Sequence, residues 1–149
     1  MFFAFESDFA GSLRCIPMIA RQKLDIVGIK LSLRKWSRLT WDERDELALL
    51  PCQATDDQET YRALVLRLIA LRSDEPPTWI ETKRLEDWQN DSQMPDAVKV
   101  QAEADGVSPP TAQEWSRLTA LQRFALIKLA RSKHENKNFL PAMKEFGIL

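Results

Sequence analysis

Few residues of this 149-residue chain could support metal or nucleophilic chemistry, and their spacing suits neither. His134 is the only histidine, and Cys15 and Cys52 lie far apart without a C-x-x-C arrangement. A structural zinc site needs several such ligands at characteristic spacing, and no local motif supports a Cys–His nucleophilic pair. No pair of carboxylates stands out either. We therefore expect two thiols that act as small hydrophobic side chains, one surface imidazole, no metal, no cofactor and no catalytic residue.

Two aromatic and two cationic side chains recur in matching positions. Trp36 and Trp115 each open the same five letters, WSRLT, and Arg44 and Arg123 follow at equal distances. The tryptophans could be stacking platforms for a ligand, but we favour buried rings that join a short helix to its neighbours. Truncating a buried tryptophan to Ala should cost roughly 3–5 kcal/mol. For the arginines we favour a structural clamp onto backbone carbonyls or a nearby carboxylate over a ligand-binding role.

A polar turn is the candidate functional site. Five consecutive hydrogen-bonding side chains, His134-Glu135-Asn136-Lys137-Asn138, stand between two strongly apolar segments. A helix C-cap followed by a solvated loop would explain them. The functional alternative is a specific contact surface for another protein, because loops held by rigid scaffolds often carry recognition.

The charge pattern argues against nucleic acid as a partner. The formal net charge is −1 and the cations are interleaved with acids, whereas phosphate neutralisation supplies most nucleic-acid affinity. A helix-turn-helix is the alternative, since Ala102 and Gly106 have suitable spacing. However, the segment that follows opens with Pro109-Pro110 and carries Glu114 where a recognition helix needs cations.

Two features indicate a cytoplasmic protein. The start, MFFAFESDF, lacks the basic region of a signal peptide. No run of 18 apolar residues is present, so we expect no membrane contact. The two cysteines should then be free thiols in a reducing compartment.

The helices that position these residues can be predicted from an internal repeat in the sequence. Upstream of WSRLT, Pro17 matches Pro95 and Gly28 matches Gly106. Proline suits the first turn of a helix, and glycine supplies the left-handed residue that ends one. We therefore predict two diverged copies of one helical unit. The expected division is pseudo-repeats at about 13–72 and 92–149, with a connector at 73–91, in a single domain 1–149.

Within each copy, a short helix and a longer one should follow the glycine. The short helices are predicted near Ser32–Leu39 and Thr111–Leu118. Capping boxes, in which a Thr and a Glu or Gln three residues later exchange hydrogen bonds with the backbone, are predicted at Thr40, Thr111 and Thr119. The helix after Thr119 is apolar on nearly every side, so we expect it at the centre of the core.

Other segments are predicted from their apolar spacing and their helix breakers. We expect a loop at 53–58, a helix at Glu59–Arg72, a connector tied down by Trp79 and Trp88 with a short helix near Glu81–Trp88, and a last helix that Gly147 ends. Phe2, Phe3, Phe5 and Phe9 should fold back onto the helical body, with no second strand to pair with this arm. The predicted fold class is all-α, with about six to eight helices.

Two long motifs together resemble a known family. The first runs Leu13-Arg14-Cys15-Ile16-Pro17-Met18, then Lys23-Leu24-Asp25 and Gly28-Ile29-Lys30-Leu31. The second runs Leu121-Gln122-Arg123-Phe124-Ala125-Leu126, then from His134 to Pro141. These stretches resemble the nitrate reductase-associated protein family of cyanobacteria and photosynthetic eukaryotes.

The resemblance implies a small soluble accessory protein that supports the activity or maturation of assimilatory, molybdenum-dependent nitrate reductase. The family offers no established catalytic residues. The leading hypothesis is therefore a non-enzymatic factor that binds nitrate reductase. The alternatives are a nucleic-acid-binding regulator of nitrogen assimilation genes and a small-molecule or molybdenum-cofactor carrier, which would need a pocket lined by several cations.

Overall fold

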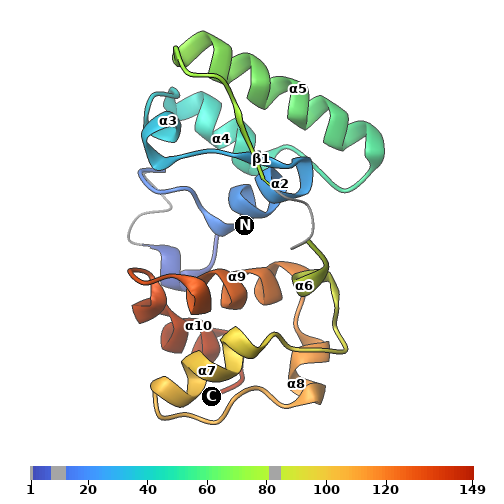
Figure 1. Ribbon diagram of the computed structural model, residues 1–149, viewed down its shortest axis with the longest axis vertical. Coiled ribbons are helices and arrows are strands. Elements are labelled where there is room, and N and C mark those ends of the chain that lie inside the picture. The colour runs from blue at the N-terminus through green and yellow to red at the C-terminus, as the bar shows by residue number, and fades with distance from the viewer. Residues whose placement is uncertain (1, 8–12, 81–84) are drawn as a thin grey trace. The chain divides into compact units, whose positions relative to one another are not determined.

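The computed structural model of the chain describes residues 2–7, 13–80 and 85–149, and it is mostly helical (Figure 1). The chain divides into two compact units, residues 1–83 and 84–149. The described residues contain nine α-helices, one more than the upper end of the prediction, and six of the nine have seven or more residues. Within the same ranges, no helix is both long and apolar enough to cross a bilayer.

The first unit holds η1 (Ala4–Glu6), α2 (Met18–Val27), β1 (Ile29–Lys30), α3 (Leu33–Ser37), α4 (Trp41–Leu49), α5 (Thr55–Arg72) and β2 (Thr78–Trp79). The second unit holds α6 (Leu85–Gln89), α7 (Asp96–Ala104), α8 (Ala112–Arg117), α9 (Ala120–Arg131), η3 (Asn136–Asn138) and α10 (Phe139–Glu145).

Helices α2 and α7 are bounded as the proline–glycine pairs predict, with a shift of one residue at the start. Pro17 and Pro95 are N-cap residues with extended ψ values of 155° and 147°, so each helix begins one residue after its proline. Gly28 and Gly106 have φ values of 78° and 73°. Because side chains are strained at such angles, glycine is the suitable residue at both ends.

The predicted capping boxes at Thr40, Thr111 and Thr119 are all confirmed. Each Thr hydroxyl accepts the backbone N–H three residues on, and the Glu or Gln at that position accepts the N–H of the Thr. The helix after Ser32 is capped by the serine alone, since Lys35 donates its N–H to the Ser32 hydroxyl. These caps satisfy N–H groups that have no partner inside the helix.

The first unit is packed around α5, which lies against α2. The buried residues of α5 are Tyr61, Leu64, Val65, Leu68 and Ile69. Tyr61 donates its hydroxyl to the carbonyl oxygen of Leu47 at 2.7 Å, so α4 and α5 are also joined inside the core.

Three predictions for the first unit are wrong in detail. Helix α5 begins at Thr55, inside the predicted loop, because Asp56 and Asp57 favour the positive end of a helix. A small antiparallel sheet pairs Ile29 with Trp79 and Lys30 with Thr78, so the fold is not purely helical. Trp79 is 56 % exposed on this two-residue strand, and only Trp88 of the connector tryptophans is buried.

The N-terminal arm packs back as expected, and an unexpected carboxylate holds it. Phe2 packs against the core of the first unit, and the rings of Phe3 and Phe5 stack with centroids 5.4 Å apart. Glu6 is buried and accepts the N–H of Met18 at 2.7 Å, at the first turn of α2. Phe9 and the start of the predicted helix Glu81–Trp88 lie outside the described residues.

Helix α9 is the centre of the second unit, as its apolar sequence predicts. It contacts α6, α7, α10 and η3 (Figure 1). Its buried residues are Arg123, Phe124, Ala125, Leu126, Ile127 and Leu129. Two residues, Ser132 and Lys133, separate the end of α9 from the polar turn 134–138, so this buried helix fixes where the turn begins.

Candidate protein-contact site

The polar turn 134–138 has a backbone held by Ser132. The hydroxyl oxygen of Ser132 accepts the N–H groups of His134, at 3.2 Å, and Glu135, at 2.8 Å. Asn138 then donates its N–H to the carbonyl of Glu135 at 2.9 Å, which closes η3. Sequence reasoning missed Ser132, although a serine two residues before such a turn is a recognisable signal.

The side chains of the turn differ in exposure. His134 and Lys137 are exposed, whereas Glu135, Asn136 and Asn138 are half-buried. The structure therefore brings all five predicted residues into one turn but presents two of them most fully to solvent.

Helix α10 anchors the far end of the turn. Phe139, Ala142 and Met143 are fully buried on one face, and α10 packs on α9. The chain is helical from Asn136 to Glu145, so residues seven apart share a face. Lys137 and Lys144 consequently lie on the exposed face, away from the buried one.

Trp36 and Trp115 are buried rather than available for stacking on a ligand. Their exposed fractions are 0 % and 1 %. Trp36 Nε1 donates to the carbonyl of Leu13 at 2.8 Å, and Trp115 Nε1 donates to the carbonyl of Asn90 at 3.1 Å. Each indole therefore ties its short helix to a segment upstream.

Arg44 and Arg123 bind backbone carbonyls in matching ways. Arg44 donates to the carbonyls of Leu39, at 3.1 Å, and Leu13, at 3.0 Å. Arg123 donates to the carbonyls of Leu118 and, at 2.8 Å, Trp88. Leu39 and Leu118 both precede a Thr N-cap, so each arginine closes the junction between a short helix and the next helix.

The cysteines and His134 are not brought together as a metal site. Among the described residues, no group of three or more His, Cys, Asp and Glu side chains could hold a metal ion. Both cysteines are free thiols, Cys15 half-buried and Cys52 buried. Burial raises the pKa of Cys52, which favours its protonated, unreactive form.

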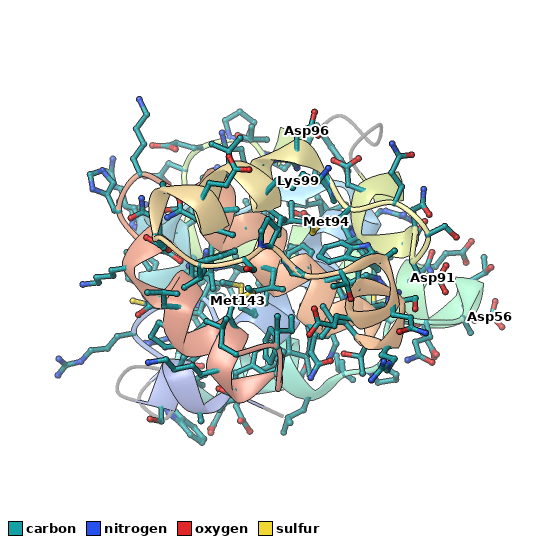
Figure 2. All side chains as sticks on the ribbon, turned by 90° about the horizontal axis from the view of Figure 1, so that it is seen from below. Asp56, Asp91, Met94, Asp96, Lys99 and Met143 are labelled. Carbon is teal, nitrogen blue, oxygen red and sulfur yellow. The ribbon has the colours of Figure 1, made fainter. Side chains whose placement is uncertain are left out.

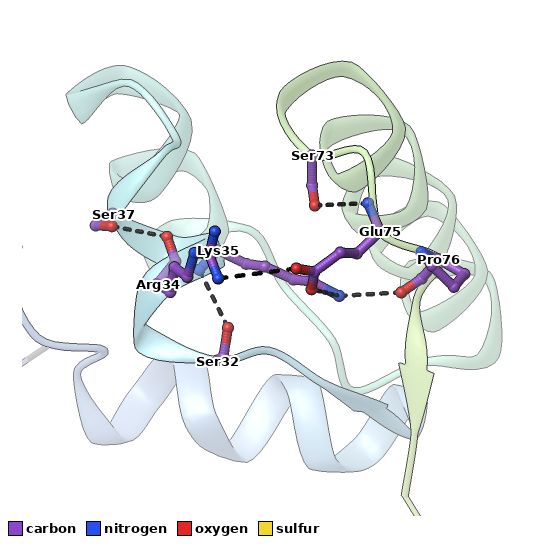
Figure 3. Close-up of polar contacts among 7 residues, drawn as sticks. All are labelled: Ser32, Arg34, Lys35, Ser37, Ser73, Glu75 and Pro76. Atoms are coloured by element: carbon purple, nitrogen blue, oxygen red, sulfur yellow. Dashed lines mark hydrogen bonds and ion pairs between the residues drawn. The ribbon is translucent and has the colours of Figure 1, made fainter.

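Two more lysines have structural roles that the sequence did not reveal. Burial lowers the pKa of Lys23, whose Nζ donates to the carbonyl of Ala48 at 2.6 Å. Lys35 is only 8 % exposed, and its Nζ lies 3.0 Å from the carbonyl oxygen of Pro76 and 3.9 Å from the Glu75 carboxylate (Figure 3). Lys35 thereby attaches the segment before β2 to α3.

A small pocket beside Lys35 does not resemble a carrier site. Its volume of about 10 Å³ is that of about one water molecule. Its lining is mainly apolar and includes two cations, Lys35 and Arg72. Both cations already have carboxylate partners. Lys35 lies 3.9 Å from the Glu75 carboxylate, and Arg72 binds the Glu43 carboxylate at 3.0 Å. The molybdenum-cofactor carrier stays a prediction that no feature of this pocket favours.

The helix-turn-helix alternative also lacks a favouring feature. Helix α8, in the position of a recognition helix, is six residues long. Its Glu114 is engaged with Thr111 in the capping box. The nucleic-acid hypothesis therefore stays a prediction from the sequence.

The fold and the turn define a class: a mostly helical protein with a fixed polar turn on a buried scaffold. The family model described as "Conserved nitrate reductase-associated protein" matches residues 2–146. The chain belongs to this family. No curated protein and no solved structure matches it.

Proposed function

We propose that this protein is a non-enzymatic accessory factor that binds assimilatory, molybdenum-dependent nitrate reductase in the cytoplasm and supports its maturation or activity. The observation that carries the proposal is family membership over residues 2–146, since the family's description names association with nitrate reductase. Protein–protein contact would be its means of action.

The polar turn 134–138 is the contact site that we propose. Its backbone is fixed by Ser132, and its flanks are fixed by the buried residues of α9 and α10. A contact loop that is already ordered loses little conformational freedom on binding, which favours affinity.

Co-purification of the two proteins tests this proposal. Wild-type protein should retain the reductase at micromolar concentration, and the variant Lys137→Glu should retain less of it. Lys99→Glu, at an exposed position on α7, is the matched control and should behave as wild type. A missing complex, together with normal reductase maturation in cells that lack this protein, would disprove the proposal.

We also propose that the scaffold arose by doubling of one helical unit. The matched prolines, left-handed glycines, threonine caps and arginine–carbonyl bonds in the two halves support this origin. Experimental coordinates in which residues 13–50 fail to superpose on residues 92–129 would contradict it.

A further inference from the structure

We infer that a basic surface formed by Lys133, Lys137 and Lys144, beside His134, binds an acidic face of the partner protein. This inference rests on the proposed function and gives the chemistry of the contact. It extends the site beyond the polar turn along α10, to residues that the sequence did not single out.

Charge is segregated within the second unit. From Ala120 to Leu149 there are six Lys and Arg residues against two acidic residues. From Arg84 to Thr119 there are seven acidic residues against three cations. Asp91 and Asp96, labelled in Figure 2, belong to the acidic part. The net charge of the whole chain conceals this separation.

Half of the six cations are already engaged inside the unit. Arg123 binds carbonyls, Arg131 binds the Asp87 carboxylate at 2.7 Å, and Lys128 lies 5.3 Å from the centroid of the Phe124 ring. The other three, Lys133, Lys137 and Lys144, are exposed and have no ion-pair partner in the part of the chain that the structure describes.

The backbone that carries the three lysines is ordered. Lys137 and Lys144 are one heptad apart on the exposed face of the η3–α10 helix. Lys133 lies within the loop that Ser132 organises. An array of cations held on an ordered backbone suits a complementary acidic patch, which guides encounter and fixes orientation.

A protein face fits this surface better than nucleic acid does. Affinity for a duplex comes from many phosphate contacts along a rod of charge. Here only three lysines and His134 are available, and acidic residues dominate the rest of the unit. The half-buried amides of Asn136 and Asn138 add groups for directional hydrogen bonds.

A paired charge reversal tests the inference. The variant Lys137→Glu/Lys144→Glu is compared with Lys99→Glu/Arg117→Glu, which makes the same change in net charge at two exposed positions of the acidic part. The dissociation constant for purified nitrate reductase should rise about tenfold or more for the first variant and change little for the second. Raising the salt concentration should weaken wild-type binding more steeply than binding of the first variant. Circular dichroism checks that both variants fold.

The outcomes separate this inference from the proposed function. Equal reductase binding by both variants would overturn the inference and leave the proposed function standing. If wild-type protein does not bind the reductase and the reductase matures normally in cells that lack this protein, the proposed function fails. The affinity of the basic surface for acidic groups is then tested by an NMR titration with oligoglutamate, which should shift the amide signals of residues 131–144. An absence of shifts there would overturn the inference.

Two other binding partners for this basic surface, nucleic acid and a second copy of the chain, can be tested with the same proteins. A short DNA duplex that binds residues 131–144 more tightly than oligoglutamate would overturn the inference in favour of nucleic acid. Self-association that the Lys137→Glu/Lys144→Glu variant abolishes, measured by sedimentation, would make a second copy of the chain the occupant and would also overturn it.

Discussion

Several buried or half-buried cations in this protein bind backbone carbonyls. Arg123 is 7 % exposed, and its guanidinium binds the carbonyls of Trp88 and Leu118. Carbonyls at helix ends have no partner inside the helix, so a side chain must satisfy them when the end is buried. Arginine suits this task because its planar group presents several donors at fixed angles.

Replacing Arg123 with Met should therefore be strongly destabilising. We expect the free energy of unfolding to fall by about 2–3 kcal/mol, since the charge-assisted hydrogen bonds are lost and buried carbonyls lose their donors. Arg117→Met removes an exposed arginine and should change stability by less than about 0.5 kcal/mol. Urea denaturation measures both, and equal midpoints for the two variants would contradict the clamp.

Tyr61 should report on the core at alkaline pH. Burial raises its pKa well above the ordinary value of 10.0. Because the folded pKa exceeds the unfolded one, the stabilisation is complete below about pH 10 and is lost as pH rises further. Tyr61 is the only tyrosine, so its ultraviolet ionisation signal should appear only as the protein unfolds. Ionisation near pH 10 with native circular dichroism would contradict this.

At the scale of elements, a side-chain pair joins the start of α4 to the end of α5. Arg72 donates to both carboxylate oxygens of Glu43, at 3.1 and 3.0 Å. The same carboxylate accepts the N–H of Thr40 in the capping box at 2.9 Å. One carboxylate thus serves both a helix cap and a contact between helices.

This arrangement predicts a dependence of stability on acid. The hydrogen bond from Arg72, followed by that from Thr40, lowers the pKa of Glu43 below its usual 4.5. A lowered folded pKa gives stabilisation that is present above pH 4.5 and is lost as pH falls through the folded pKa. Glu43→Gln should therefore flatten the fall of stability below pH 4.5, measured by urea denaturation at several pH values. Glu46→Gln, at an exposed neighbour, should leave that slope unchanged.

At the scale of the whole molecule, local rules predicted most of the helices, and contacts between distant residues supplied the rest. The helices that begin after Thr40, Thr111 and Thr119 could be predicted because a helix cap is a local sequence motif. Strand β2 forms by pairing with Ile29 and Lys30, which lie far away in the chain. With only two residues, the strand is too short to show an alternation of apolar and polar side chains. Distant pairings of this kind are invisible to periodicity.

The candidate site was predictable in position but not in extent. Five consecutive polar residues marked the turn 134–138 in the sequence. Lys144 belongs to the same exposed face only because the chain stays helical from Asn136 to Glu145. The burial of Glu6 and Lys35 could not be predicted from the sequence either, because their hydrogen-bond partners, Met18 and Pro76, lie in other segments.

The division into two compact units predicts that their stabilities can be perturbed separately. Phe139 is fully buried in the second unit. Phe139→Ala should cost roughly 3–5 kcal/mol, which corresponds to about a hundredfold or greater acceleration of hydrogen exchange for amides that open with that unit. The accelerated amides should be those of α7, α9 and α10, with a smaller effect on α5.

Leu47→Ala, in the core of the first unit, is the reciprocal variant. It should accelerate exchange in α4 and α5 more than in α9. Native-state exchange followed by NMR resolves both patterns, because compact units with their own buried residues tend to open as cooperative blocks. Uniform acceleration of α5 and α9 in both variants would instead mean that the 149 residues unfold as one block. A substitution in the first unit would then destabilise the turn 134–138 as much as Phe139→Ala does.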